Sequence, residues 1–336
     1  MMKTHMNIPV FIPHLGCGHS CAFCSQRSVT NVMAAPSPES VAFSIKEALR
    51  TKGDKKAEIA FFGGSFTGIP RKDQEAYLLA AKPFLLSGEA EGIRLSTRPD
   101  YIDEETVSFL KAHGVKTVEL GAQSMSDDVL EKSRRGHTAA DTRRAARLII
   151  EGGLTLGLQM MTGLPLSTPE KEAETAREFV RLGAKEARIY PLAVFYATPL
   201  YAEMLSGRFV PPTAEESVDR VADALAILEE GGIKVLRIGL METQTLSSCI
   251  AGGAYHPAMG EMARARLWRN RLEKALSGLW GDVTVFCEEK LISSVLGHKR
   301  DNFRFLSEKY PVRLSLAHTE KGVYLLQNEI RKEILI

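Results

Sequence analysis

The feature that most constrains the fold of this chain is an alternation of short apolar segments with longer amphipathic ones. The short segments have the length and composition of buried strands, and the longer ones carry apolar residues at helical spacing. Strands are predicted at 57–64, 93–96, 117–120, 155–161, 186–190 and 234–238, with helices between them that include 71–86, 103–113, 168–182 and 214–230. Such alternation indicates a parallel sheet built from right-handed crossovers. About six strand–helix units are too few to close an eight-stranded barrel, so we expect an α/β fold with an open, partial (β/α)6 barrel.

Polar and glycine-rich turns follow each predicted strand. They are GGSFTG at 63–68, STRPD at 96–100, GAQS at 121–124, TGLP at 162–165 and YPLA at 190–193. Because the carboxyl ends of parallel strands meet at one edge of the sheet, these turns are expected to share a rim. The sequence therefore predicts a functional site at that rim.

Three cysteines follow the first apolar segment in the spacing C-x3-C-x2-C: Cys17, Cys21 and Cys24. Soft thiolate ligands select zinc, copper(I) or an iron–sulfur cluster. Structural zinc and a fully ligated cluster each want a fourth protein ligand. The other cysteines, Cys249 and Cys287, are distant in sequence and are expected to be small buried hydrophobes. The simplest interpretation is a cluster with three protein ligands and one open iron.

Two alternatives remain for the cysteine segment. His14 or His19 could complete a zinc site. The N-terminus lacks a signal peptide, so we expect the chain to lie in the cytoplasm. A disulfide is disfavoured in that compartment. Of the other histidines, His137 is expected to be structural rather than catalytic.

The segments CGHSCAFC, GGSFTG, LSTRPDYI, VELGAQSMSDDVLEKSRRGHT and LGLQMMTGLP resemble the radical S-adenosylmethionine superfamily. The resemblance covers roughly residues 5 to 260 and points to the branch that holds oxygen-independent coproporphyrinogen oxidase and the catalytic subunit of elongator. It implies a [4Fe–4S] cluster on Cys17, Cys21 and Cys24. The open iron would bind S-adenosylmethionine, which is cleaved to give a 5′-deoxyadenosyl radical. A one-electron reductant of the flavodoxin or ferredoxin type is implied as partner.

The resemblance also implies a set of cofactor contacts. They are Phe11, Gly63, Gly64, Ser65, Ser96, Arg98, Gln123, Arg135, Gln159 and Ala193. Gln123 and Arg135 would hold the ribose and the carboxylate, and Phe11 and Ala193 would line the adenine. No general acid or base is assigned.

Two positions depart from the porphyrin-oxidising pattern. Ser96 and Gln159 stand where those relatives carry acidic residues, which counts against porphyrin oxidation. STRPD at 96–100 and AYHPAMGE at 254–261 resemble the elongator side instead. The predicted substrate is therefore RNA, with wobble-uridine modification of tRNA as the leading hypothesis. A small molecule or peptide substrate, or haem carriage through His14, His19 or His256, remain as alternatives.

The alternating pattern ends near residue 240, so we expect a barrel domain at 1–240 and a small α+β extension at 241–336. No room remains in the extension for elongator's acetyltransferase domain. It holds basic residues that could contact RNA phosphates: Arg264, Arg266, Arg269, Arg271, Lys299 and Arg300. The alternative is a solvated helix face with Trp268 packed inward. The net charge of the whole chain, +2, gives no argument for nucleic acid or membrane.

Overall fold

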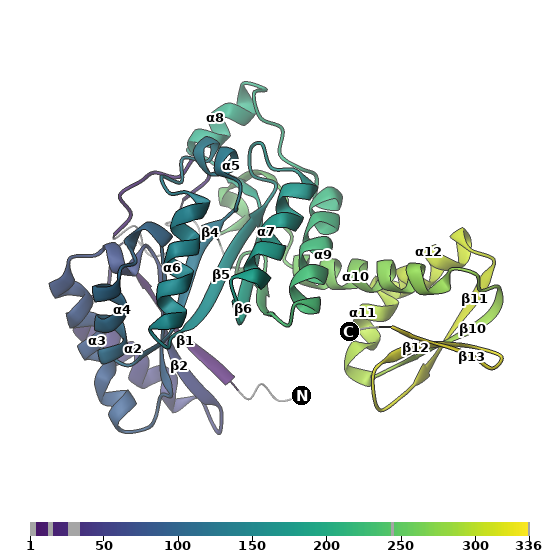
Figure 1. Cartoon of the computed structure of the whole chain (residues 1–336), viewed down its shortest axis with the longest axis horizontal. Coiled ribbons are helices and arrows are strands. Elements are labelled where there is room, and N and C mark those ends of the chain that lie inside the picture. The colour runs from purple at the N-terminus through teal and green to yellow at the C-terminus, as the bar shows by residue number, and fades with distance from the viewer. Residues whose placement is uncertain (1–4, 13–15, 26–33, 243–244, 335–336) are drawn as a thin grey trace.

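A computed structural model of the chain describes residues 5–12, 16–25, 34–242 and 245–334. Its main feature is a seven-stranded sheet in the order β1-β2-β3-β4-β5-β6-β8, in which every pairing is parallel. The strands are β1 (His5–Ile12), β2 (Lys56–Gly63), β3 (Gly92–Thr97), β4 (Val115–Gln123), β5 (Thr155–Thr162), β6 (Glu186–Pro191) and β8 (Lys234–Ile238). The sheet curls into a half barrel with β1 and β8 as its two edges (Figure 1). The predicted partial barrel is confirmed, with the segment at 234–238 as its seventh strand.

Helices cover the outer face of this sheet (Figure 1). They are α2 (Pro38–Arg50), α3 (Arg71–Leu86), α4 (Glu104–Ala112), α5 (Asp127–Lys132), α6 (Ala139–Glu151), α7 (Pro169–Arg181) and α9 (Ala214–Glu230). The local sequence explains where two of these helices begin. Thr138 with Asp141 and Thr213 with Glu216 form capping boxes that satisfy the first N–H groups of α6 and α9.

The two faces of the strands differ sharply in chemistry. Alternate residues such as Ile59, Phe61, Leu95 and Val118 are fully buried beneath the helices and form the main hydrophobic core. Burial of each such side chain contributes about 1.5–3 kcal/mol to folding. The residues between them face the inside of the half barrel, and many are polar or charged. Because successive side chains of a strand point to opposite faces of the sheet, the apolar core lies on one face and the more polar interior of the half barrel lies on the other.

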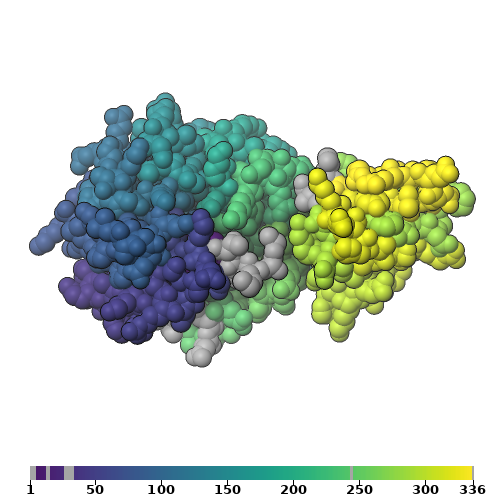
Figure 2. Space-filling model, turned by 90° about the horizontal axis from the view of Figure 1, so that it is seen from below, coloured from purple at the N-terminus to yellow at the C-terminus, as the bar shows by residue number. Residues whose placement is uncertain are grey.

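The second part of the chain forms a smaller lobe beside the barrel (Figure 2). Its sheet has the order β11-β10-β12-β13 and its own core, which includes Trp268 and Leu272. Its elements are β10 (Gly281–Cys287), α11 (Ile292–Leu296), α12 (Asp301–Lys309), β11 (Val312–His318), β12 (Val323–Gln327) and β13 (Ile330–Ile334). Helix α10 (Met259–Leu276) joins this lobe to the barrel.

The division at residue 240 stays a prediction. β9 (Ile250–Gly253) pairs with β7 (Ala193–Phe195), which follows β6 directly. Residues beyond 240 therefore still contact the barrel, and we propose that the two units divide within α10.

The arginines of α10 bind acidic residues of α9. Arg264 donates to Glu229 at 2.8 Å, and Arg266 pairs with both Glu215 and Asp219. Arg271 lies 3.6 Å from Glu229. Trp268 is buried, as the alternative interpretation required. Three of the six predicted basic residues thus serve helix–helix packing, because α9 supplies carboxylates that the local sequence of α10 does not reveal.

The other three predicted basic residues have different surroundings. Lys299 and Arg300 are exposed and precede α12, while Arg269 packs over the ring of Phe305. Within the described residues, no helix combines the length and the apolar character needed to cross a bilayer.

Candidate functional site

The three cysteines lie on a loop that follows β1, at the carboxyl end of the sheet. Cys21 is buried, Cys17 is half-buried and Cys24 is exposed. The loop is fixed by backbone hydrogen bonds, with Ala22 N–H donating to Ser133 O at 3.0 Å. Leu200 N–H, at the start of α8 (Pro199–Leu205), donates to Ala22 O at 2.9 Å. Segments far apart in sequence therefore hold the cysteine loop.

Glycine lets this loop lie directly against the turn that follows β2. Gly16 has φ +72°, and a Cβ added there would lie 2.0 Å from the carbonyl oxygen of Ser65. A Cβ on Gly68 would meet Gly16 O at 2.2 Å. In the same contact, the Cys17 sulfur lies 3.7 Å from Ser65 Oγ. Only residues without side chains fit where the two backbones meet.

Replacement of Gly16 by alanine is expected to displace the cysteine loop and cut the iron content of the reconstituted protein by more than half. The reason is twofold, since the new Cβ clashes with backbone and the positive φ disfavours any side chain. Iron and sulfide analysis after anaerobic reconstitution measures the effect. Gly53→Ala is the matched control, because Gly53 also has positive φ but no atom lies within 4 Å of its Cβ position. Equal iron loss in both variants would contradict the role of the Gly16 contact.

A brace formed by 98–101 holds two parts of the site together. Arg98 is almost fully buried and makes a bidentate pair with Asp100 at 2.9 and 3.0 Å. It also donates to the carbonyl oxygen of Arg135 at 2.5 Å. The hydroxyl of Tyr101 accepts a hydrogen bond from Gly18 N–H at 3.2 Å. Arg98 does not line the cavity described below, so we propose that it positions the site rather than touching the cofactor.

Arg135 contacts the cysteine loop directly. One terminal nitrogen donates to the Cys21 sulfur at 3.1 Å, and the other donates to Gly121 O at 2.6 Å. Nearby, burial and then the charges of Arg135 and Arg98 lower the pKa of His137 to about 4. The ring of His137 is therefore neutral at pH 7. Its structural role stays a prediction.

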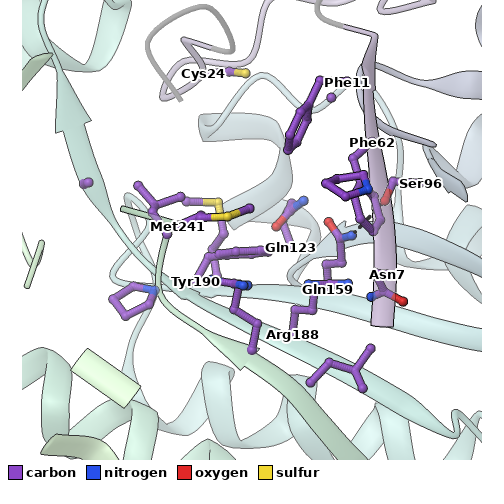
Figure 3. A pocket seen from close by; sticks show the side chains of 18 of the residues that line it. Asn7, Phe11, Cys24, Phe62, Ser96, Gln123, Gln159, Arg188, Tyr190 and Met241 are labelled. Carbon is purple, nitrogen blue, oxygen red and sulfur yellow. Dashed lines mark hydrogen bonds between the residues drawn. The ribbon is translucent and has the colours of Figure 1, made fainter. Parts of the chain in front are cut away.

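A cavity of about 750 Å³ lies inside the half barrel, next to the cysteine loop. The predicted cofactor residues that line it are Phe11, Gly63, Ser96, Gln123, Gln159 and Ala193, together with Cys24. They come from five strands of the main sheet and from β7. Figure 3 shows Cys24 and Phe11 at one end, with Gln123 and Gln159 between them and Arg188. The other four predicted cofactor residues lie behind this wall and do not line the cavity: Gly64, Ser65, Arg98 and Arg135.

Gln123 places an unpaired hydrogen-bond acceptor on the wall of the cavity. It is a non-glycine residue with φ 65° at the end of β4, and it is buried. Its Oε1 atom has no hydrogen-bond partner in the part of the chain that the structure describes. A buried acceptor left unpaired costs about 1–3 kcal/mol. A ligand with a donor group, such as a hydroxyl, would recover that cost.

Beneath the cavity lies a layer of buried ion pairs that sequence reasoning missed. Arg94 donates to Glu58 at 2.7 Å, to Glu119 at 2.8 Å and to Glu186 at 2.8 Å. Arg188 binds both oxygens of Glu119, at 2.6 and 3.0 Å. The sequence did contain a sign of this layer, since each of these charged residues lies in a short apolar strand at a position that faces the interior.

Glu119 is the centre of this layer. Burial alone would raise the pKa of Glu119, but hydrogen bonds and charge from Arg188 and Arg94 outweigh it and hold the pKa below its usual range. Gln159 donates its amide to Glu119 at 2.9 Å and to Ser96 Oγ at 3.2 Å. The two positions that depart from the porphyrin pattern are therefore bonded to each other, and Gln159 also bonds to this ionised carboxylate.

The donor set of the loop fits an iron–sulfur cluster. Three thiols lie within eight residues, and a guanidinium beside one sulfur suits a negatively charged thiolate. Within the described residues, no three histidine, cysteine or acidic side chains are already arranged to hold a metal ion. His14 lies outside the described residues. His19 and His256 are exposed, and neither lines the cavity.

Comparison with known proteins gives two family matches. The chain matches the Radical SAM superfamily over residues 11–179 and the Radical_SAM C-terminal domain over residues 184–269. Among curated proteins, it is 29% identical over 171 residues to the tRNA uridine(34) acetyltransferase of Methanocaldococcus jannaschii, a match that covers 50% of this chain and 31% of that protein. It is 26% identical over 233 residues to human Elongator complex protein 3, covering 63% of this chain and 42% of the relative. The chain thus spans less than half the length of these relatives.

Solved structures share the fold. The Elp3 of Methanocaldococcus infernus, with its N-terminus deleted, superposes with a TM-score of 0.63 at 23% identity, covering 80% of this chain and 64% of that one. Coproporphyrinogen III oxidase from Escherichia coli gives a TM-score of 0.50 at 17% identity, covering 68% and 54%.

Proposed function

Because this chain belongs to the radical SAM superfamily, we propose that Cys17, Cys21 and Cys24 bind a [4Fe–4S] cluster at which S-adenosylmethionine is cleaved. The observation that carries this proposal is the cavity that begins at Cys24 and is lined by residues from every strand of the main sheet and from β7. When bound, the cluster supplies the electron that splits the cofactor into methionine and a 5′-deoxyadenosyl radical able to abstract hydrogen from a substrate. The electron itself comes from a one-electron reductant of the flavodoxin or ferredoxin class.

The protein's residues orient the cofactor and exclude water. Phe11 and Ala193 offer apolar surface for the adenine, and Gln123 offers its unpaired oxygen to a ribose hydroxyl. Arg135, held by Arg98, donates to the Cys21 sulfur from behind the cavity wall, where its positive charge would stabilise the ligand thiolate. The mostly apolar walls protect a reactive species from solvent.

For the substrate, we propose a wobble uridine of tRNA, with the reaction in the cytoplasm. Two observations support this proposal: the names of the relatives above, and sequence similarity to them over 171 and 233 residues. Exposed Lys299 and Arg300 remain candidates for RNA contact, whereas Arg264, Arg266 and Arg271 are occupied by α9. The relatives' acetyltransferase activity is not carried over, since the chain spans only part of their length.

Comparison of tRNA nucleosides from strains with and without the gene tests the substrate. A modified uridine that disappears on deletion and returns with the wild-type gene, but not with a Cys21→Ala gene, is the expected result. Unchanged nucleosides, with no tRNA binding at moderate salt, would reject RNA as substrate and leave the cleavage chemistry standing.

A further inference from the structure

The charged residues that line the cavity are all of one sign. They are Lys55, Arg188 and Arg237, with His5 beside them, and no aspartate or glutamate is among the lining residues. A cleft whose wall carries charge of one sign concentrates ligands of the other. The cavity is therefore suited to a substrate with an anionic group.

The three cations differ in how their charge is balanced. Arg188 is neutralised by Glu119, which it binds through two hydrogen bonds. Arg237 lies on β8 directly opposite Arg188 in the sheet register, and it is half-buried. Within the described residues, neither Arg237 nor Lys55 has an ion-pair partner. A bound anion would supply the partner that Arg237 and Lys55 lack.

Two of these residues, His5 and Lys55, lie far from the cysteine loop along the strands, and Arg237 lies beside Arg188, which Figure 3 shows on the far side of Gln123 and Gln159 from Cys24. Arg237 and His5 belong to the two edge strands of the half barrel, β8 and β1, and Lys55 immediately precedes β2. His5 and Phe11 are six residues apart on β1, on the order of 20 Å at the rise of an extended strand. Phe11 and Cys24 mark the opposite end of the cavity in Figure 3. An anion near His5 and Lys55 is thus too far from the cysteine loop to be the carboxylate of the cofactor.

We propose that Arg237, assisted by Lys55, forms a subsite for a phosphate group of the substrate. A guanidinium binds phosphate oxygens in a bidentate manner, and a lysine adds a point charge. The proposal rests on the proposed nucleotide substrate and deepens it. Asn7, Gln159 and Tyr190, which also line the cavity, then supply polar contacts for the attached base or sugar.

Calorimetric binding of uridine and uridine 5′-monophosphate to the full chain tests the subsite. The monophosphate is expected to bind at least tenfold more tightly than the nucleoside, and Arg237→Gln should remove this gain. Arg237→Lys, which keeps the charge, should retain part of it and shows that the site still folds. Arg177→Gln is the matched control, because Arg177 is an exposed arginine on α7 that pairs only with Glu174. Equal affinity of the two ligands for the wild type, or a gain that persists in Arg237→Gln, overturns the proposal.

A third ligand, an unmodified anticodon stem–loop RNA, distinguishes the two sources of phosphate. Weaker RNA binding in Arg237→Gln identifies a phosphodiester of RNA, whereas an effect on the monophosphate alone identifies a free nucleotide. If Arg237→Gln weakens S-adenosylmethionine binding and leaves both phosphate ligands unaffected, the residue belongs to the cofactor site and the proposal is wrong. Because these measurements do not depend on tRNA modification, the subsite can stand even where the nucleoside comparison rejects the tRNA substrate.

Discussion

Joint replacement of Cys17, Cys21 and Cys24 by alanine is expected to reduce iron in the reconstituted protein from about four atoms per chain to background. Formation of 5′-deoxyadenosine from S-adenosylmethionine should fall below detection at the same time. The expectation follows from the donor chemistry, because the described part of the chain offers no second set of thiols near the cavity. Iron and sulfide analysis, absorbance and product chromatography under reductant measure both effects.

Cys249→Ala is the control for this experiment. Cys249 is half-buried outside the cavity and should be dispensable for iron binding. The triple variant should also fold, since backbone contacts hold the loop, but it should melt somewhat below the wild-type apoprotein because it loses the buried hydrogen bond from Arg135 to Cys21. Cluster colour and cofactor cleavage that both survive the triple replacement would refute the central assignment.

Replacement of Glu119 by alanine is expected to lower the free energy of unfolding by about 3–5 kcal/mol. It leaves Arg188 buried without its carboxylate partner and takes from Arg94 one of its three. Removing one partner of a buried ion pair costs far more than replacing the pair, because the remaining charge stays desolvated. Urea unfolding monitored by circular dichroism gives the magnitude.

Glu174→Ala controls for loss of a carboxylate as such, because Glu174 is exposed on α7 and its pairs with Arg177 and Arg181 should contribute less than about 1 kcal/mol. The pH dependence provides a second measurement. Since the folded-state pKa of Glu119 is lowered, its stabilisation is fully present above the ordinary value of 4.5 and is lost as the pH falls through the lowered pKa. A wild-type protein and a Glu119→Ala variant of equal stability at pH 7 would show that the ion pairs are not structural.

The sequence predicted the sheet and its rim because strand periodicity and glycine-rich turns are local properties. It could not predict the interior of the half barrel. Arg94 bonds to Glu58 and to Glu119 on the two neighbouring strands, and no local pattern shows which charged residues will face each other. The same limit explains the basic stripe of α10, whose carboxylate partners lie some 35–51 positions earlier on α9.

The family resemblance did not predict which of the named residues face the cavity. Gln123 and Gln159 lie on the cavity wall, as a cofactor contact requires, but Arg98 lies behind it and bonds to Asp100. A motif fixes the place of a residue in the chain, whereas the side-chain direction depends on neighbours from other strands. Arg237 was missed for that reason, since its significance comes from Arg188 on the adjacent strand.

The way the cysteine loop is held also determines the order in which the protein matures. The described part of the loop forms no strand or helix, and its supports are the turn after β2, Tyr101, Ser133 and the start of α8. All of these belong to elements that come later in the chain, so the last of them is synthesised some 175 residues after Cys24. The three thiols therefore reach the arrangement described here only after the chain has been synthesised as far as α8. For the proposed cluster, this means that the complete binding site forms late in folding.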